Sequence, residues 1–263
     1  MLGAIIGDIV GSTYEFGSCK IKTFTLFRPG CRPTDDSIMT IAVGRACADA
    51  DITDEDDFKD KVTSHMRRLG RMYRAAGYGG MFYRWLMSDR MGPYGSFGNG
   101  SAMRVSPVAY AGRSLEEVEQ LAKWSAEVTH DHPDGIAGAQ AVAGATYLAR
   151  MKESKDAIKE YVEKNFYDLS SFTLDEIRPS YKFDVTCQGS VPQAIRCFLE
   201  SESYEDAIRL AVSLGGDADT QAAMAGAIAE AYYGIPDEIS EQGLSYLDET
   251  LLEEYEAYAE WLY

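Results

Sequence analysis

Residues 213–234 read SLGGDADTQAAMAGAIAEAYYG, and this stretch is the strongest indication of the fold in the sequence. Asp217 and Asp219 follow a Gly-Gly pair, Thr220 comes next, and a helical run of Ala and Gly completes the stretch. Because Gly costs about 1 kcal/mol relative to Ala inside a helix, close packing of another backbone must offset it. We therefore expect this helix inside a bundle. Its two acids either cap the helix or hold a metal together with ligands elsewhere in the chain.

The helical period continues along most of the chain. Residues 114–128 open with Ser114 and Glu117 in capping-box spacing, and apolar residues then fall on one face. Residues 203–214 repeat this design behind Ser203. Further helices are expected at 54–76, with a break near Gly70, at 133–149 and at 244–263.

Strand signals are scarce. Apolar runs at 24–27 and 181–185 are short and isolated, and the sequence shows no alternation of strands with helices. The pattern predicts an all-α fold, a compact single-domain multi-helix bundle over residues 1–263 with roughly ten or more helices.

Composition excludes several classes of protein. The chain has 263 residues, and its 42 acidic residues against 25 basic ones give a formal net charge of −17. Binding to a nucleic-acid backbone is therefore not expected, because such proteins normally carry the opposite charge. No stretch approaches the roughly 18 to 20 apolar residues of a membrane span, and the N-terminus lacks the basic region of a signal peptide. We expect a cytoplasmic protein without a membrane partner.

The second acidic group lies in CRPTDDSIMTIAVGRACADA, residues 31–50. Thr34 is a candidate N-cap for the helix that follows. Asp35 and Asp36 then fall in its first turn, where the helix dipole favours anions. Taken alone, this group is explained by capping, as is the group at 217–220.

Together the two groups suggest more than capping. Each supplies two carboxylates and one hydroxyl from a helix N-terminus, and carboxylates brought together repel one another unless cations lie between them. Oxygen ligands without His or Cys favour Mg²⁺, Mn²⁺ or Ca²⁺ over zinc. The candidate metal ligands are Thr34, Asp35, Asp36, Asp217, Asp219 and Thr220.

A third acidic motif, GDIVGSTYEF, spans residues 7–16. Asp8 and Glu15 lie seven residues apart and share a face if one unbroken helix contains both. Glycines in the motif weaken helix propensity there. We interpret Asp8 as solvated or as a local cap, and leave the role of Glu15 open.

The glycine-rich segment GPYGSFGNGSAMRVSPVA, residues 92–109, is a candidate anion site. Exposed amides where a loop enters a helix bind phosphate, and an arginine in the helix adds a fork of donors; the alternative is a simple turn. The residues concerned are Gly98, Asn99, Gly100, Ser101 and Arg104.

Two of the three histidines lie in EVTHDHPDG, residues 127–135. A His-x-His pair binds metal, contacts substrate or closes a helix. Because oxygen donors for a metal are plentiful elsewhere, we favour substrate contact for His130. Gly79 and Gly80 are candidates for a pocket wall.

In their order along the chain, these motifs resemble those of the ADP-ribosylglycohydrolase family. The motifs are GAIIGDIVGSTYE at 3–15, TDDS at 34–37, GNGSAMR at 98–104, THDHP at 129–133 and LGGDADTQAAMAGAIAEAYYG at 214–234. The resemblance implies an all-α bundle with two Mg²⁺ (or Mn²⁺) ions in an ADP-ribose cleft. It makes Asp219 the bridging ligand, Glu15 an acid that acts in catalysis or gates the site, the loop 98–101 the diphosphate-binding segment and His130 a substrate contact.

The activity implied by the resemblance is hydrolysis of the glycosidic bond at C1″ of ADP-ribose. It would release ADP-ribose from a modified acceptor or a small conjugate, through a transition state like an oxocarbenium ion, with Asp36 or Glu15 taking the proton of the attacking water. A monomer is expected. The residues at this part of the sequence resemble those of a bacterial subgroup of the family, so the resemblance does not identify the acceptor; they are Cys187, Gln188 and Gly189. The alternatives are a metal-dependent nucleotide phosphoesterase and a non-catalytic ADP-ribose-binding module.

Overall fold

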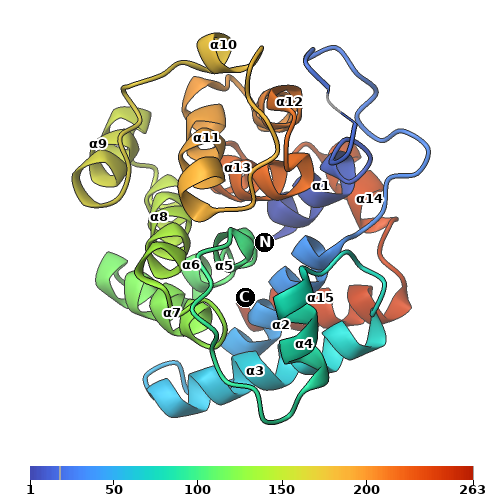
Figure 1. The fold of residues 1–263 in the computed structure, drawn as a ribbon, viewed down its shortest axis with the longest axis vertical. Helices are drawn as coiled ribbons and strands as arrows, with labels where there is room; N and C mark the ends of the chain where they lie inside the picture. Colours follow the sequence, from blue (N-terminus) through green and yellow to red (C-terminus); the bar gives the residue numbers. More distant parts are fainter. Residues whose placement is uncertain (18, 263) are drawn as a thin grey trace.

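The computed structural model describes residues 1–17 and 19–262, which form fifteen helices (Figure 1). Ser18 and Tyr263, which belong to the domain expected over 1–263, lie outside the described residues. The helices are α1 (Leu2–Gly11), α2 (Asp35–Asp49), α3 (Glu55–Met72), α4 (Gly80–Met87), α5 (Gly100–Met103), α6 (Val108–Ala111), α7 (Leu115–Glu127), α8 (Pro133–Arg150), α9 (Lys155–Asn165), α10 (Leu174–Ile177), α11 (Cys187–Glu200), α12 (Tyr204–Leu214), α13 (Ala218–Tyr233), α14 (Asp237–Leu244) and α15 (Glu249–Leu262).

The expected all-α, compact single-domain bundle is confirmed. The described residues contain no strand, and the strand-like segments at 24–27 and 181–185 form none. An isolated bridge pairs Gly98 with Thr186. Within the part of the chain that the structure describes, no helix combines the length and the apolar character that crossing a membrane requires.

Local capping chemistry sets several helix starts as expected. Ser114 caps α7 by accepting from the backbone N–H of Glu117, and Ser203 caps α12. The capping box at α7 is half formed, because the Glu117 carboxylate accepts from the N–H of Arg113.

Two expected helix boundaries are wrong. Helix α3 runs unbroken through Gly70, where an added Cβ would lie 2.7 Å from a methyl carbon of Leu86; this glycine makes room for a neighbour and does not break the helix. The helix expected at 244–263 begins only at Glu249, because Leu244 ends the preceding helix, α14.

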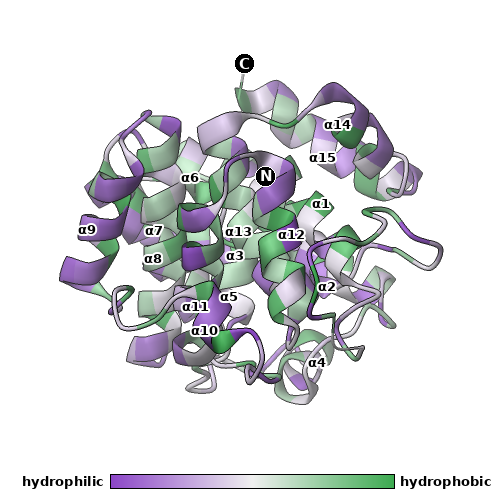
Figure 2. Cartoon of the chain, turned by 90° about the horizontal axis from the view of Figure 1, so that it is seen from above, coloured by the Kyte–Doolittle hydropathy of each residue, from purple (hydrophilic) through white to green (hydrophobic). Residues whose placement is uncertain are grey.

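Helix α13 lies in the middle of the bundle, where Figure 2 shows hydrophobic residues concentrated, while outer helices such as α9 are largely hydrophilic. Helix α1 packs along it, and all ten of its residues are buried. A Cβ added to Gly7 would lie 2.1 Å from the carbonyl oxygen of Ala222, and one added to Gly11 would lie 2.4 Å from Cα of Asp219. The two backbones therefore touch directly, which explains the small residues of both helices.

Candidate active site

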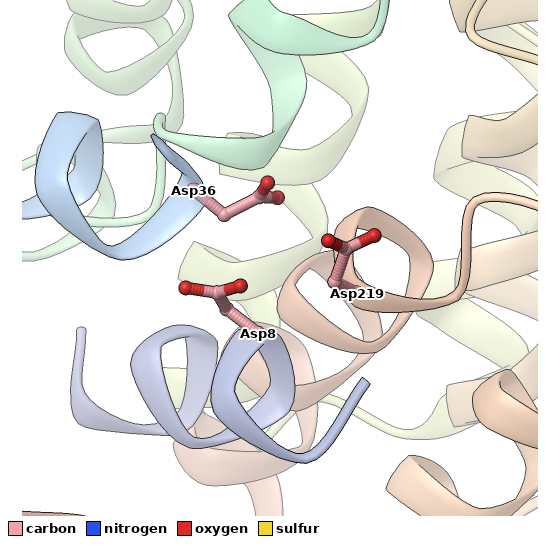
Figure 3. Close-up of side chains that lie close together, drawn as sticks. All are labelled: Asp8, Asp36 and Asp219. Carbon is pink, nitrogen blue, oxygen red and sulfur yellow. The ribbon is translucent and has the colours of Figure 1, made fainter. Parts of the chain in front are cut away.

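Three helices bring buried acids to one point. Asp8 from α1, Asp36 from α2 and Asp219 from α13 point toward one another (Figure 3), and one carboxylate oxygen of each lies within 4.8 Å of the others. A second group at the same spacing comprises Glu15, Asp217 and Asp219. Asp219 belongs to both groups, so the acids form one continuous cluster.

Asp8 anchors the start of α2. Its carboxylate accepts from the N–H of Thr34 at 2.8 Å, from Thr34 Oγ1 at 2.6 Å, from the N–H of Ser37 at 3.0 Å and from Ser37 Oγ. The first N–H groups of a helix lack partners within the helix, and Asp8 satisfies them from another helix. The interpretation of Asp8 as a solvated residue or a local cap is therefore wrong.

Thr34 is the N-cap of α2, as expected, and its side chain accepts from the N–H of Asp36. Its hydroxyl donates to Asp8 Oδ1 at 2.6 Å. Asp36 Oδ2 accepts from Thr220 Oγ1 at 3.3 Å. Its other oxygen, Oδ1, is buried without a hydrogen-bond partner. An orphaned buried carboxylate oxygen is costly, and a hard cation is a partner that fits it.

The start of α13 is built differently. Asp217 occupies the N-cap position, but its side chain makes no capping hydrogen bond. Its Oδ2 instead accepts from Asn99 Nδ2 at 2.6 Å, and Asn99 Nδ2 also lies 3.2 Å from Ser190 Oγ. Gly215 and Gly216 precede it with φ of +70° and +77°, values that glycine adopts most readily. Capping therefore does not explain Asp217.

Glu15 does not share a helical face with Asp8. Helix α1 ends at Gly11, and Glu15 reaches the cluster from the turn that follows. The glycine and serine at the end of α1 are the local reason for this ending.

Burial and mutual repulsion raise the pKa of most of these acids. Burial raises the pKa values of Asp36 and Asp219 well above their usual range, and neighbouring carboxylates add to the effect. Burial raises the pKa of Asp35 to about 8 and that of Glu15 to about 7. Burial also raises the pKa of Asp8, against its bonds from Thr34 and Ser37. A divalent cation offsets both causes.

The cluster forms the floor of a cleft with a volume of about 420 Å³. The expected site residues that line it are Glu15, Asp35, Asp36, Gly98, Asn99, Gly100, Arg104, His130, Asp217, Asp219 and Thr220. Gly79 and Gly80 line the wall, as expected. The structure also adds Phe183 and Val185, which the sequence did not single out because they precede α11 in an irregular segment.

Two expected site residues do not line the cleft. Thr34 lies beneath it, bonded to Asp8. Ser101 is buried and donates its hydroxyl proton to the carbonyl of Gly135 at 2.7 Å. Its side chain therefore connects residues 98–101, the glycine loop, to α8.

The glycine loop is held from the side of α11. The N–H of Asn99 donates to the carbonyl of Val185 at 2.8 Å, and the N–H of Cys187 donates to the carbonyl of Phe97 at 2.9 Å. Cys187 is buried, and its thiol lies 3.2 Å from the carbonyl oxygen of Gly98. The segment before α11 therefore supports the loop.

Comparison with known proteins places the chain in a family. The model of the family described as ADP-ribosylglycohydrolase matches residues 1–263. The chain belongs to the ADP-ribosylglycohydrolase family. Membership confirms the resemblance and makes the chain a hydrolytic enzyme, of a family that removes ADP-ribose from acceptors. The two groups of acids have the spacing that can hold a metal ion in such an ADP-ribosylglycohydrolase.

Individual ADP-ribosylglycohydrolases show how far the similarity extends. The chain is 29% identical over 306 residues to ADP-ribosylhydrolase ARH3 of Homo sapiens, covering 89% of this chain and 84% of the relative. It is 26% identical over 276 residues to ADP-ribosyl-[dinitrogen reductase] glycohydrolase of Rhodospirillum rubrum, covering 94% and 88%. A solved ADP-ribosylglycohydrolase-related protein complex matches with a TM-score of 0.71 and 26% identity, covering 100% of this chain and 96% of that one.

Proposed function

We propose that this chain uses two divalent cations, Mg²⁺ or Mn²⁺, to hydrolyse the glycosidic bond at C1″ of ADP-ribose and so release ADP-ribose from a modified acceptor. The observation that carries the proposal is the position of Asp219, which belongs to two groups of carboxylates, each within 4.8 Å. A residue shared in this way suits a bridge between two cations. Residues 1–263 act as one catalytic domain in this proposal.

The donor set fits such ions. The ligands would be Thr34, Asp35, Asp36, Asp217, Asp219 and Thr220. Asp36 Oδ1 is buried without a partner, and all the donors are oxygens. When bound, the ions supply positive charge that lowers the pKa of water and stabilises charge near the anomeric carbon. Asp8 positions Thr34 and the start of α2 from behind the ligands.

The wall of the cleft binds the diphosphate and its neighbouring groups. Arg104 lines the cleft and is fully buried, and its Nε and Nη1 have no hydrogen-bond partner, so we assign its guanidinium to the diphosphate. Of the loop amides, Gly98 N–H already donates to Ser96 Oγ and Asn99 N–H to a carbonyl. Gly100 and Ser101 therefore supply the amide donors, and His130 supplies a side-chain donor.

Glu15 is the residue we assign to proton transfer. Asp36 is buried among the ligands, whereas Glu15 is partly exposed and lines both the cleft and an outer cavity shared with Phe16 and Phe183. Glu15 takes a proton from the attacking water while the bond from C1″ to the acceptor breaks. It then returns the proton to the acceptor atom that leaves with the electron pair. Glu15 also closes the side of the cleft at which the acceptor lies.

The acceptor is an ADP-ribosylated side chain or a small ADP-ribose conjugate. ARH3 is named as an ADP-ribosylhydrolase, and the bacterial relative is named for ADP-ribosylated dinitrogen reductase. We extend the general reaction, and no particular target, to this chain. We further propose a cytoplasmic monomer.

A hydrolysis panel tests the proposal. ADP-ribose linked to arginine, serine, glutamate or nucleic acid, its polymers and O-acetyl-ADP-ribose are incubated with the protein and Mg²⁺, Mn²⁺ or EDTA. Free ADP-ribose, released with either metal and lost with EDTA, is expected. AMP with ribose phosphate would identify a phosphoesterase instead, and binding without turnover of any substrate would identify a binding module.

A further inference from the structure

A chain of three polar side chains lies in the wall of the cleft. Arg104 Nη2 donates to Thr129 Oγ1 at 2.9 Å and to the carbonyl of Ser125 at 2.9 Å. Thr129 Oγ1 lies 2.7 Å from His130 Nδ1. All three side chains are almost fully buried, and Thr129 is not among the residues expected from the sequence.

The number of protons available determines which atom donates in each of these hydrogen bonds. A guanidinium donates and never accepts, so Thr129 Oγ1 is the acceptor of the bond from Arg104. The hydroxyl then keeps its single proton for another acceptor, and Nδ1 of His130 is within reach at 2.7 Å. If Nδ1 carried a proton instead, Thr129 would accept twice and its own buried proton would have no acceptor among the bonds described. Leaving a buried donor unsatisfied destabilises the protein.

We propose that Thr129 is a positioning residue that, oriented by Arg104, holds His130 as the tautomer protonated at Nε2. The inference rests on the proposed function for the identity of the ligand, a phosphate or ribose oxygen of ADP-ribose, to which Nε2–H donates. Arg104 thereby acts through Nη2 on Thr129, while its Nε and Nη1 are buried without a hydrogen-bond partner.

The place of Nε2 supports this role. A Cβ added to Gly100 would lie 3.2 Å from His130 Nε2, and one added to Gly98 would lie 3.5 Å away. The Nε2 edge therefore faces the glycine loop, while the ring of Tyr94 packs near the imidazole at 5.9 Å between centroids. Burial, with the nearby charge of Arg104, holds the pKa of His130 well below its usual range. The ring is neutral, so its tautomer decides whether Nε2 donates or accepts.

The chain of bonds gives selectivity for an anionic or hydroxyl ligand. With Nε2 protonated, His130 offers a donor beside the loop amides, and an accepting phosphate oxygen satisfies it. With the opposite tautomer, a lone pair would face the same oxygen and repel it. A single hydroxyl proton on Thr129 thus selects between attraction and repulsion at the cleft wall.

The experiment compares the wild-type protein with Thr129→Val and Thr129→Ser. Long-range ¹H–¹⁵N NMR on histidine-labelled protein reports which ring nitrogen is protonated, and calorimetry with ADP-ribose and Mg²⁺ reports affinity. We expect protonated Nε2 in the wild type and in Thr129→Ser. Thr129→Val should show a mixed or reversed tautomer and an ADP-ribose Kd about ten-fold higher, the order of one hydrogen bond.

Thr146→Val is the matched control. Thr146 is a buried threonine of α8 whose hydroxyl bonds within its own helix, to the carbonyl of Val142 at 2.7 Å. This variant should keep the wild-type tautomer and affinity. His65 and His132 serve as internal references in the same spectra.

The outcomes separate this inference from the proposed function. Protonation of His130 at Nδ1 in the wild type overturns the inference, even if Thr129→Val fails to fold. An unchanged tautomer and Kd in folded Thr129→Val overturns it as well. If the wild type neither binds nor hydrolyses ADP-ribosyl compounds, the proposed function fails, while the tautomer measured in the free protein still decides the role of Thr129.

Discussion

The starts of α2 and α13 carry nearly the same residues, two acids and a threonine, yet the structure holds them in opposite ways. At α2, the cap is complete: Thr34 accepts from the N–H of Asp36, Asp8 of α1 accepts from the N–H of Ser37, and the carbonyl of Ala76 accepts from the N–H of Asp35. At α13, Asp217 makes no capping bond and is held by Asn99 from the glycine loop. One terminus is therefore fixed by the core of the bundle, and the other by the wall of the cleft.

This difference separates two functions of buried acids. Asp8 has every oxygen satisfied by donors, so it stabilises the fold as an anchor. Asp36 and Asp219 lie close together, Asp36 Oδ1 is buried without a partner, and burial with neighbouring carboxylates raises the pKa of both acids, so they reduce the stability of the metal-free protein. Substitution of each acid by its amide tests this comparison directly.

The largest effect is expected for Asp219→Asn. Because Asp219 belongs to both groups of acids, its loss should reduce hydrolysis to the detection limit in the ADP-ribose release assay. The same change removes repulsion from the metal-free protein. The melting temperature in EDTA should therefore rise by about 3 °C, the shift for about 1 kcal/mol in a chain of this size.

The control for this prediction is Asp237→Asn, an exposed acid in the first turn of α14. It should leave both the rate and the melting temperature near the wild-type values. A rate for Asp219→Asn within a few-fold of the wild type would remove the basis for a shared ligand.

Asp8→Asn should act in the opposite direction on stability. An amide that turned its N–H₂ group toward the N–H groups of Thr34 and Ser37 would set donor against donor, so it turns that group toward Thr34 Oγ1, whose hydroxyl then accepts and no longer donates to residue 8. The remaining bonds, made to a neutral amide oxygen instead of a charged carboxylate, are weaker. The expected cost is about 2–3 kcal/mol, which lowers the melting temperature by about 5–10 °C. Calorimetry in EDTA measures it. A rise like that of Asp219→Asn would show that Asp8 is one more repelling member of the cluster.

The smallest effect is expected for Asn99→Ala. It removes the 2.6 Å bond to Asp217 and the bond to Ser190, so Mg²⁺ affinity should fall by about ten-fold, with a smaller loss of melting temperature than in Asp8→Asn because fewer hydrogen bonds are affected. Titration of Mg²⁺ followed by calorimetry measures this. Asn165→Ala, which removes an exposed asparagine of α9, is the control. Unchanged Mg²⁺ affinity would mean that Asn99 serves the loop alone.

The sequence predicted the parts of this fold that depend on local chemistry. Thr34, Ser114 and Ser203 begin helices because a hydroxyl and the next backbone N–H groups are neighbours in the chain. The motifs also contain Glu15, Asp36, Asp217 and Asp219, which the structure brings together, whereas Asp35, expected as a ligand, belongs to neither group of acids. Those predictions needed no information on how helices pack.

The parts that failed depend on partners distant in the chain. Asp8 precedes its partner Thr34 by 26 residues, so the sequence could not show that the two residues bind each other inside the bundle. A break in the helix was expected near Gly70, because the sequence could not show that the side chain of Leu86 packs against this glycine. Thr129 lay beside a recognised histidine, but its role depends on Arg104, 25 residues earlier.

The glycines of α1 limit which substitutions the active site tolerates. Where Gly7 and Gly11 meet α13, backbone touches backbone, and no rotamer can absorb an added methyl group. A carbon at Gly11 would displace the Cα of Asp219 itself. A substitution at Gly7 or Gly11 that leaves a folded protein can therefore still separate the buried acids of the cluster, although neither position has a side chain in the site.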